Sequence, residues 1–138
     1  MDRYVEYKKR KQAEFDKLPM KAAFGNKQFE QIMKEWGLTT SKEDLTKIHQ
    51  LGAGCYCLKK DYPLFLKLAC KHMEEDVEFF KDDDNLKSAF KYEFADHECG
   101  YTYTPQDALL ALPFTYKEVM TNKRLCRVFK KAWTEYIK

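Results

Sequence analysis

The chain has 138 residues and a net charge of +3, and 44% of its residues are hydrophobic and 15% aromatic. This composition excludes disorder for most of the chain, and no apolar run approaches the roughly 18 residues of a membrane span. A chain of this length buries roughly two thirds of its unfolded surface. We therefore expect one domain over residues 1–138, with a helix at 1–17 at its periphery.

The first part of the chain predicts two helices and a short strand. Residues 3–17 are typical of a polar helix that Pro19 ends, because proline disfavours helical geometry in the residue before it. This charged segment lacks the apolar core of a secretory signal, so we expect a cytoplasmic protein. The apolar run 20–24 indicates a strand. Helical spacing then predicts a second helix, with Asn26 as its N-cap and Gly37 as its stop.

The middle of the chain predicts a β-hairpin. Two short runs, 47–51 and 55–58, flank the sequence Gly-Ala-Gly at 52–54. These glycines lack the lysine and the later glycine of known phosphate-binding loops, so we interpret them as a turn. Before the hairpin, Ser41 and Asp44 give a weak capping signal for a single helical turn.

Two long helices follow the hairpin. The first has Asp61 as its expected cap and one apolar face, made of Phe65, Leu68, Ala69, His72, Met73, Val77 and Phe80. The second has Asp84 as its expected cap and one face made of Leu86, Phe90, Phe94 and His97. The run 82–84 of three Asp residues suits the positive end of the second helix and lacks the spacing of a calcium loop.

The last part of the chain predicts three more helices. Pro105 suits the first position of a short helix at 108–112, and Thr115 and Glu118 form a capping box for the next helix. The final helix has one apolar stripe, made of Leu125, Phe129, Ala132, Trp133 and Tyr136. The whole pattern predicts a mainly helical α+β domain with a small two- or three-stranded antiparallel sheet.

Charge is segregated along the chain. Residues 74–98 carry ten acids and three lysines, a net charge of −7, whereas residues 117–138 carry seven basic and two acidic residues, a net charge of +5. A dipolar domain of this kind attracts a charged partner at one end. The alternative interpretation is that the two segments face each other or cover solvated helices.

The five cysteines do not form a recognisable framework. Their number is odd and their spacing scattered, and Cys55 and Cys57 form C-x-C instead of the C-x-x-C of zinc ribbons. The pattern favours reduced and mostly buried thiols. It predicts neither a metal site nor a cofactor.

One polar cluster, Asp96-His97-Glu98 with Tyr101 and Tyr103, lies where the second long helix is expected to end. Together with 23–29 and the turn 51–54, it resembles a set of small uncharacterised proteins from bacteriophages and Firmicutes mobile elements. Those proteins carry a run like N-H-E-x-x-Y-T and a segment A-F-x-x-x-Q-F, and Asp96 here stands where that run has Asn. The resemblance spans roughly residues 18–137. It implies a phage-type origin, and an accessory or anti-defence role in the host cytoplasm.

The chemistry of that cluster is open. His97 and Glu98 are candidates for an acid–base pair, but neighbouring residues on a helix point about 100° apart. A zinc-protease helix needs a second histidine at position 101, which is tyrosine here. The alternative is a structural helix end, in which His97 stabilises the last carbonyls and the tyrosines anchor the next segment.

The sequence favours a non-enzymatic protein-interaction module, because no nucleophile, base and orienting group combine in it. The candidate partner-binding residues are Asp82, Asp83, Asp84, His97, Glu98, Tyr101 and Tyr103. One alternative is nucleic-acid binding through basic terminal helices, at Lys8, Lys9, Arg10, Lys11, Arg124, Arg127, Lys130 and Lys131. Another is a small enzyme or metal protein centred on His97 and Glu98. We expect no membrane partner, and the sequence does not indicate the oligomeric state.

Overall fold

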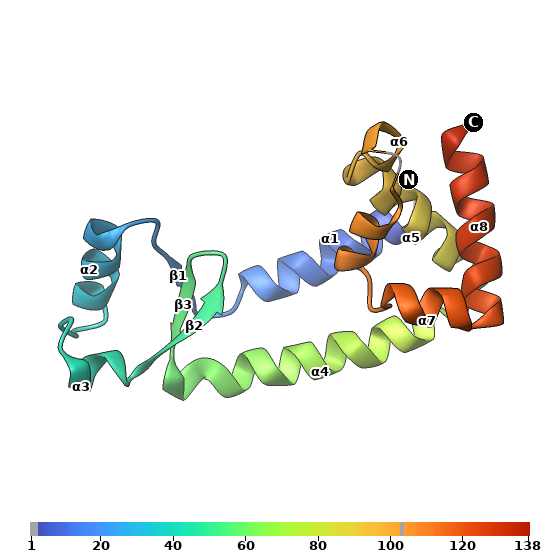
Figure 1. Cartoon of the computed structure of the whole chain (residues 1–138). Coiled ribbons are helices and arrows are strands. Elements are labelled where there is room, and N and C mark those ends of the chain that lie inside the picture. Colours follow the sequence, from blue (N-terminus) through green and yellow to red (C-terminus); the bar gives the residue numbers. More distant parts are fainter. Residues whose placement is uncertain (1–2, 103) are drawn as a thin grey trace. The chain divides into compact units, whose positions relative to one another are not determined.

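The computed structural model describes residues 3–102 and 104–138, and it is 69% helical with one small antiparallel sheet. The predicted fold class, a mainly helical α+β protein, is confirmed (Figure 1). The helices are α1 Arg3–Asp16, α2 Asn26–Glu35, α3 Lys42–Leu45, α4 Tyr62–Phe79, α5 Asp83–Asp96, α6 Cys99–Thr102, α7 Tyr116–Thr121 and α8 Lys123–Ile137. The strands are β1 Lys21–Ala22, β2 Ile48–Gly52 and β3 Cys55–Leu58, and the 3₁₀ helices are η1 Lys59–Asp61 and η2 Gln106–Ala111. Within the described residues, no helix is both long enough and apolar enough to span a bilayer.

The chain divides into two compact units. One consists of the segment up to Lys11 together with His72–Lys138, and we call it the C-terminal unit. The other is Gln12–Lys71, the sheet unit, which holds all three strands. The prediction of a single domain stays a prediction, because this division does not show whether the two units unfold together.

The sheet unit is built on the predicted hairpin. The strand order is β1-β3-β2, and both pairings are antiparallel. The turn between β2 and β3 uses positive φ angles at three successive residues, Gly52, Ala53 and Gly54. The residue after β1, Ala23, passes close to Gly54. A Cβ atom on Gly54 would lie 3.0 Å from the carbonyl oxygen of Ala23. The Gly-rich sequence is therefore required by the turn and by this close approach.

The two α-helices that lie wholly within the sheet unit, α2 and α3, begin in different ways. The N-cap of α2 is Gly25, without a side-chain hydrogen bond, so the prediction that Asn26 caps this helix is wrong. Gly25 has a φ of 133°, which a residue with a side chain rarely adopts. By contrast, the hydroxyl of Ser41 accepts from the backbone N–H of Asp44, and α3 is a single turn, as predicted.

The C-terminal unit is organised by the packing of α5 against α8 (Figure 1). Phe90 and Phe94 are fully buried, and both rings meet Phe129 edge to face, at centroid distances of 5.2 and 5.4 Å. Phe94 also meets the ring of Trp133 at 5.2 Å. Edge-to-face pairs add to the gain from burial, so this aromatic cluster is the centre of the unit. The predicted apolar stripe of the last helix is thereby confirmed.

Three predicted helix starts in this half of the chain have a clear outcome. The N-cap of α5 is Asp82, whose carboxylate accepts from the N–H groups of Asp84 and Asn85, so the prediction of Asp84 as the cap is wrong. Asp61 does not cap α4, because it belongs to the 3₁₀ turn η1 that leads into that helix. The capping box of α7, made by Thr115 and Glu118, is present as predicted.

The expected apolar face of α4 is only partly buried. Phe65 and Phe80 are buried, but the side chains of Met73 and Val77 are 67% and 63% exposed. Met73 lies seven residues before Phe80 and so shares its side of the helix, and periodicity does not show how much of that side the rest of the chain covers. The cysteine prediction also needs correction, since only Cys57 and Cys99 of the five free thiols are buried.

Candidate functional site

The acidic run at the start of α5 is largely used by the fold. Asp82 caps the helix, as described above. Asp83 accepts from Arg124 Nε at 2.7 Å and from Arg127 at 2.9 Å, and Asp83 and Asp84 are both exposed. The acidic and basic segments of the sequence therefore meet at Asp83, in agreement with the interpretation that the two charged segments face each other.

Arg124 has a second structural role. Its guanidinium donates to the carbonyl oxygens of Phe80 and Lys81, at 2.6 and 2.9 Å. These carbonyls follow the end of α4, where backbone acceptors lack helical partners. Arg124 thus joins the end of α4 to the beginning of α8, and it is half-buried in doing so.

Most of the N-terminal basic residues also have acidic partners inside the C-terminal unit. Lys8 pairs with Glu93, Arg10 with Glu75, and Lys11 with Asp76 at 2.7 Å. Lys9 is exposed. The run at 8–11 is therefore not an open basic patch, which weakens it as a nucleic-acid contact.

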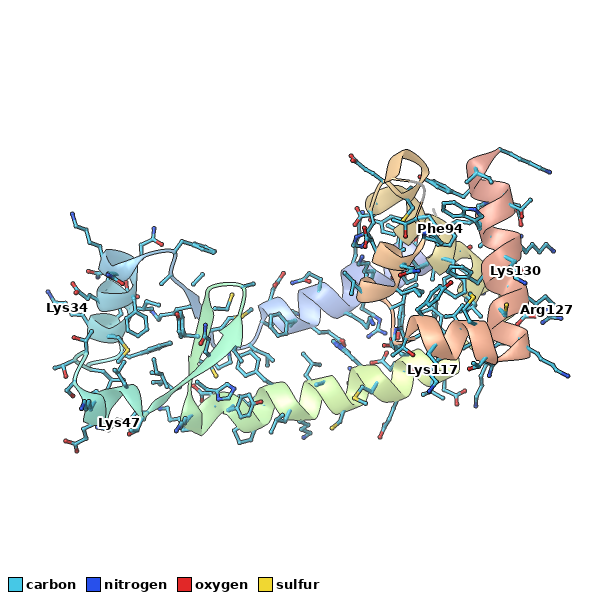
Figure 2. The ribbon with its side chains drawn as sticks, viewed as in Figure 1. Lys34, Lys47, Phe94, Lys117, Arg127 and Lys130 are labelled. Carbon is cyan, nitrogen blue, oxygen red and sulfur yellow. The ribbon has the colours of Figure 1, made fainter. Side chains whose placement is uncertain are left out.

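The outer face of α8 remains basic. Arg127, Lys130 and Lys131 are all exposed, as is Lys123 at its start. Figure 2 shows Arg127 and Lys130 on the side of α8 away from Phe94. This face is the part of the predicted basic surface that the structure leaves open to solvent.

A buried acid faces His97 at the end of α5. This acid is Glu93, whose side chain is 0% exposed. Its Oε1 accepts from the Tyr4 hydroxyl at 3.1 Å and from the Lys8 ammonium at 2.6 Å. Its Oε2 lies 3.4 Å from Nε2 of His97, which is the C-cap residue of the helix. A charged group buried in this way needs partners of opposite charge or hydrogen-bond donors.

Glu93 is not among the residues predicted for the site, although the sequence marks it as unusual. Glu93 lies seven residues after Leu86 and three after Phe90, so it falls on the apolar face predicted for this helix. An acid on an apolar stripe is unusual, because burial disfavours an unpaired charge. Glu93 is therefore recognisable as unusual because it lies on the apolar stripe, and not because it belongs to an acidic segment.

The rest of the predicted cluster is placed differently. Glu98 is exposed and has a φ of +51°, so it ends α5 in a left-handed conformation, and the acid that faces His97 is Glu93. Tyr101 belongs to α6, but its side chain lies outside the described part of the structure. Tyr103 lies outside the described residues altogether.

Burial changes the acid–base properties of groups beside this cluster. Burial raises the pKa of the Tyr4 hydroxyl well above its usual range, and the nearby Glu93 carboxylate raises it further. Tyr4 therefore stays a neutral hydrogen-bond donor at any physiological pH. Burial likewise raises the pKa of the Cys99 thiol, which makes it a poor nucleophile.

An apolar groove lies elsewhere in the C-terminal unit. It has a volume of about 400 Å³. Its lining residues are Met73, Asp76, Val77, Phe80, Lys81, Pro113, Phe114 and Arg124. Met73 and Val77 are exposed residues of α4, while Phe80, which also lines the groove, is buried. Mostly apolar grooves with a few polar groups at the rim are typical binding sites.

The sequence matches a family of unknown function, DUF7659, over residues 3–135. The chain belongs to the DUF7659 family. The expectation of an uncharacterised family is thereby confirmed. No curated protein and no solved structure matches the chain.

Membership of DUF7659 supplies no activity, and the surfaces of this chain are what bears on its function. Three features of the C-terminal unit offer recognition chemistry. They are the apolar groove beside Met73 and Val77, the basic face of α8, and the polar cluster around Glu93 and His97.

Proposed function

We propose that this DUF7659 protein is a non-enzymatic protein-interaction module that binds a basic amphipathic helix of a partner protein. The observation that carries the proposal is the groove beside α4, where Met73 and Val77 are 67% and 63% exposed. Exposed apolar side chains that adjoin an apolar groove are typical of an interaction site.

The spacing of the exposed residues favours a helical ligand. Met73 and Val77 are four residues apart on α4 and so lie on one side of it. A partner helix that inserts apolar residues at similar spacing buries this edge together with the ring of Phe114. Methionine adapts its shape to such ligands, which suits a docking surface.

The charge around the groove favours basic flanks on that helix. Glu74 and Glu78 are exposed and follow Met73 and Val77 directly in sequence, whereas Asp76, which lines the groove, is paired with Lys11. Of the two basic residues that line it, Arg124 is paired with Asp83 and Lys81 with Glu78. Lysine or arginine beside the apolar anchors of the partner thus meets acidic side chains on α4.

The proposed binding surface on α4 differs from the one predicted from the sequence. Asp82 and Asp83 are engaged in a cap and in ion pairs, so they contribute less than the sequence analysis expects. Asp84 and Glu98 are exposed and remain predicted contacts. Roles in partner binding for His97, Tyr101 and Tyr103 also stay predictions.

The test uses an amphipathic helical peptide of leucine and lysine, about five turns or ~18 residues long. Its affinity for the chain is measured by fluorescence anisotropy. Val77→Asp is expected to weaken binding about tenfold, because the substitution places a charge in the apolar contact. Leu110→Asp is the matched control, since Leu110 is 84% exposed and lies outside the groove.

A second peptide, with glutamate in place of lysine, tests the charge argument. It is expected to bind more weakly than the lysine peptide, and the difference should shrink with added salt. Equal binding of the lysine peptide to Val77→Asp and to Leu110→Asp would refute the groove as the binding site. Equal binding of the lysine and glutamate peptides would refute the proposal that the partner helix is basic.

The resemblance of residues 96–104 to phage and mobile-element proteins supports the biological setting. We place the module in the cytoplasm of an infected bacterium, as an accessory protein that inhibits a host defence protein. Expression in a host that carries defence systems is expected to raise the plaquing efficiency of a restricted phage. Val77→Asp should abolish that gain, and Leu110→Asp should leave it intact. An unchanged efficiency with the original chain would refute this role.

Nucleic-acid binding is the second candidate, and the exposed basic face of α8 favours it. Lys130→Glu together with Lys131→Glu should weaken binding of a single-stranded oligonucleotide, and added salt should weaken it for the unsubstituted chain. Lys34→Glu in α2 is the control, since Lys34 is an exposed lysine of the sheet unit. An affinity that does not depend on salt would exclude this function.

A further inference from the structure

The C-terminal end of α5 brings three potential metal ligands together. A carboxylate oxygen of Glu93, a carboxylate oxygen of Asp96 and a ring nitrogen of His97 lie within 4.8 Å of one another. We propose that these three side chains bind a divalent first-row transition-metal ion, with zinc preferred. This inference is independent of the groove and departs from the sequence-based expectation of no metal site.

The orientation of Glu93 is the observation that points to a ligand. Its Oε1 is held by Tyr4 and Lys8, at 3.1 and 2.6 Å. Its Oε2 is also buried and makes no hydrogen bond within the described residues, and Nε2 of His97, 3.4 Å away, forms an ion pair with it only when the imidazole is protonated. A buried carboxylate oxygen without a donor is costly, because desolvation is not compensated. A cation placed between this oxygen, Asp96 and His97 supplies the missing interaction.

The spacing of the donor atoms fits such an ion. Oε2 of Glu93 and Nε2 of His97 are 3.4 Å apart. Two ligand atoms that each lie about 2.0–2.1 Å from a tetrahedral zinc ion are themselves about 3.4 Å apart. Residues four apart on a helix are neighbours on one face, and Asp96 lies beside them, three residues after Glu93.

The ligand types define the class of ion. An imidazole nitrogen suits zinc, copper, iron and nickel, whereas calcium and magnesium prefer oxygen ligands alone. Affinity for a given site rises from manganese through iron, cobalt and nickel to copper, so geometry decides the preference, and the 3.4 Å spacing of the donor atoms favours tetrahedral zinc. Asp96 is exposed and the His97 side chain is 29% exposed, so an ion enters from solvent and keeps water at its remaining positions.

Tyr4 and Lys8 act as supporting residues for the site. By holding Oε1, they fix the side chain of Glu93 with Oε2 directed at His97, as outer hydrogen bonds do in metal proteins. The ammonium of Lys8 opposes a bound cation, but the Lys8 side chain is 41% exposed and water screens its charge. Two carboxylates against one ammonium leave the site attractive to a divalent ion.

The experiment measures cobalt and zinc binding to the full chain, by absorption spectroscopy and by calorimetry. The expected result is one ion per chain, with cobalt absorption in the visible range. Asp96→Asn and His97→Ala should each weaken binding by about tenfold or more, because each removes a ligand. Asp96 is exposed, so its substitution leaves the fold intact, and circular dichroism checks this for both variants.

Glu98→Gln and His49→Ala are the matched controls. Glu98 is an exposed acid two residues from Asp96, and His49 is a histidine in β2 of the sheet unit. Both controls should bind cobalt as the unsubstituted chain does. Equal affinity in Asp96→Asn, His97→Ala and the controls would overturn the proposal, as would the absence of saturable binding.

Free cysteines are the main alternative ligands, since Cys70 is exposed. Cobalt bound to a thiolate gives a strong charge-transfer band in the near ultraviolet. Our site predicts that this band is missing, because its ligands are oxygen and nitrogen. A bound ion that shows the thiolate band and is insensitive to His97→Ala would overturn the assignment.

Discussion

The C-terminal unit and the sheet unit differ most in what they bury. Fifteen hydrophobic residues of the C-terminal unit form one buried cluster. Among the described residues of the sheet unit, five are buried to the same degree: Ala23, Ile32, Met33, Cys57 and Phe65. Because apolar burial is the main stabilising term, we expect the C-terminal unit to be the more stable of the two.

The two units also differ in where their charged groups lie. The C-terminal unit contains a fully buried carboxylate, Glu93, with Tyr4 and Lys8 as partners. In the sheet unit, the ion pairs Lys21–Glu35 and Lys47–Asp44 involve partly or largely exposed side chains. A buried charge needs hydrogen-bond or ion-pair partners, and Tyr4 and Lys8 supply these to Glu93 within the C-terminal unit.

Replacing Phe94 should have the largest effect. Phe94 is fully buried and its ring meets those of Phe129 and Trp133, so Phe94→Ala is expected to lower the free energy of unfolding by about 3–5 kcal/mol. Phe24→Ala in the sheet unit should change it by no more than about 0.5 kcal/mol, because Phe24 is 75% exposed. Urea denaturation followed by circular dichroism measures both changes. Similar losses for the two variants would contradict the assignment of the core to the C-terminal unit.

Replacing Met33 should show that the two units differ in local stability. Met33 is fully buried in the sheet unit, and Met33→Ala is expected to cost about 2–5 kcal/mol locally. Amide hydrogen exchange should then increase in α2 and β3, while amides of α5 and α8 stay protected, because less stable regions open first. Met73→Ala is the control, since Met73 is 67% exposed and its loss leaves no cavity.

The outcome also tests the prediction of a single domain. If exchange increases equally in α2, β3, α5 and α8, the two units open together and form one cooperative domain. If it increases only in the sheet unit, the chain contains two units of different stability. We expect the second result, because the buried residues are distributed so unevenly.

Much of the fold follows from local signals in the sequence. The hairpin is predicted because Gly52 and Gly54 supply the positive φ angles of its turn. The capping box at Thr115 and the stripe of α8 are local patterns as well. The errors arise where a local signal has two solutions: Asp82 and Asp84 are equally good caps, and only Asp82 lies where the chain enters α5.

The candidate sites are less predictable, since they depend on distant segments. The partners of Glu93 come from α1, about 85 residues earlier in the chain, and periodicity does not identify them. Likewise, the groove combines α4 with Pro113 and Phe114. Met73 and Val77 are exposed although they continue the apolar face that contains Phe80, because periodicity shows which side of α4 is apolar but not how much of it is covered.

The smallest expected effect is the pH dependence of stability that Asp44 contributes in the sheet unit. The backbone N–H of Thr39, then the Thr39 hydroxyl and Lys47, hold the pKa of the Asp44 carboxyl at about 2, below the usual value of about 3.9. A lowered pKa means that the carboxylate stabilises the fold above about pH 4, and that this contribution is lost as the pH falls toward 2. NMR titration of the side-chain carboxyl measures the midpoint. Thr39→Val should raise it only in part, because the backbone N–H, the largest cause, remains. A midpoint near 3.9 in the unsubstituted chain would show that this exposed contact does not order the turn before α3.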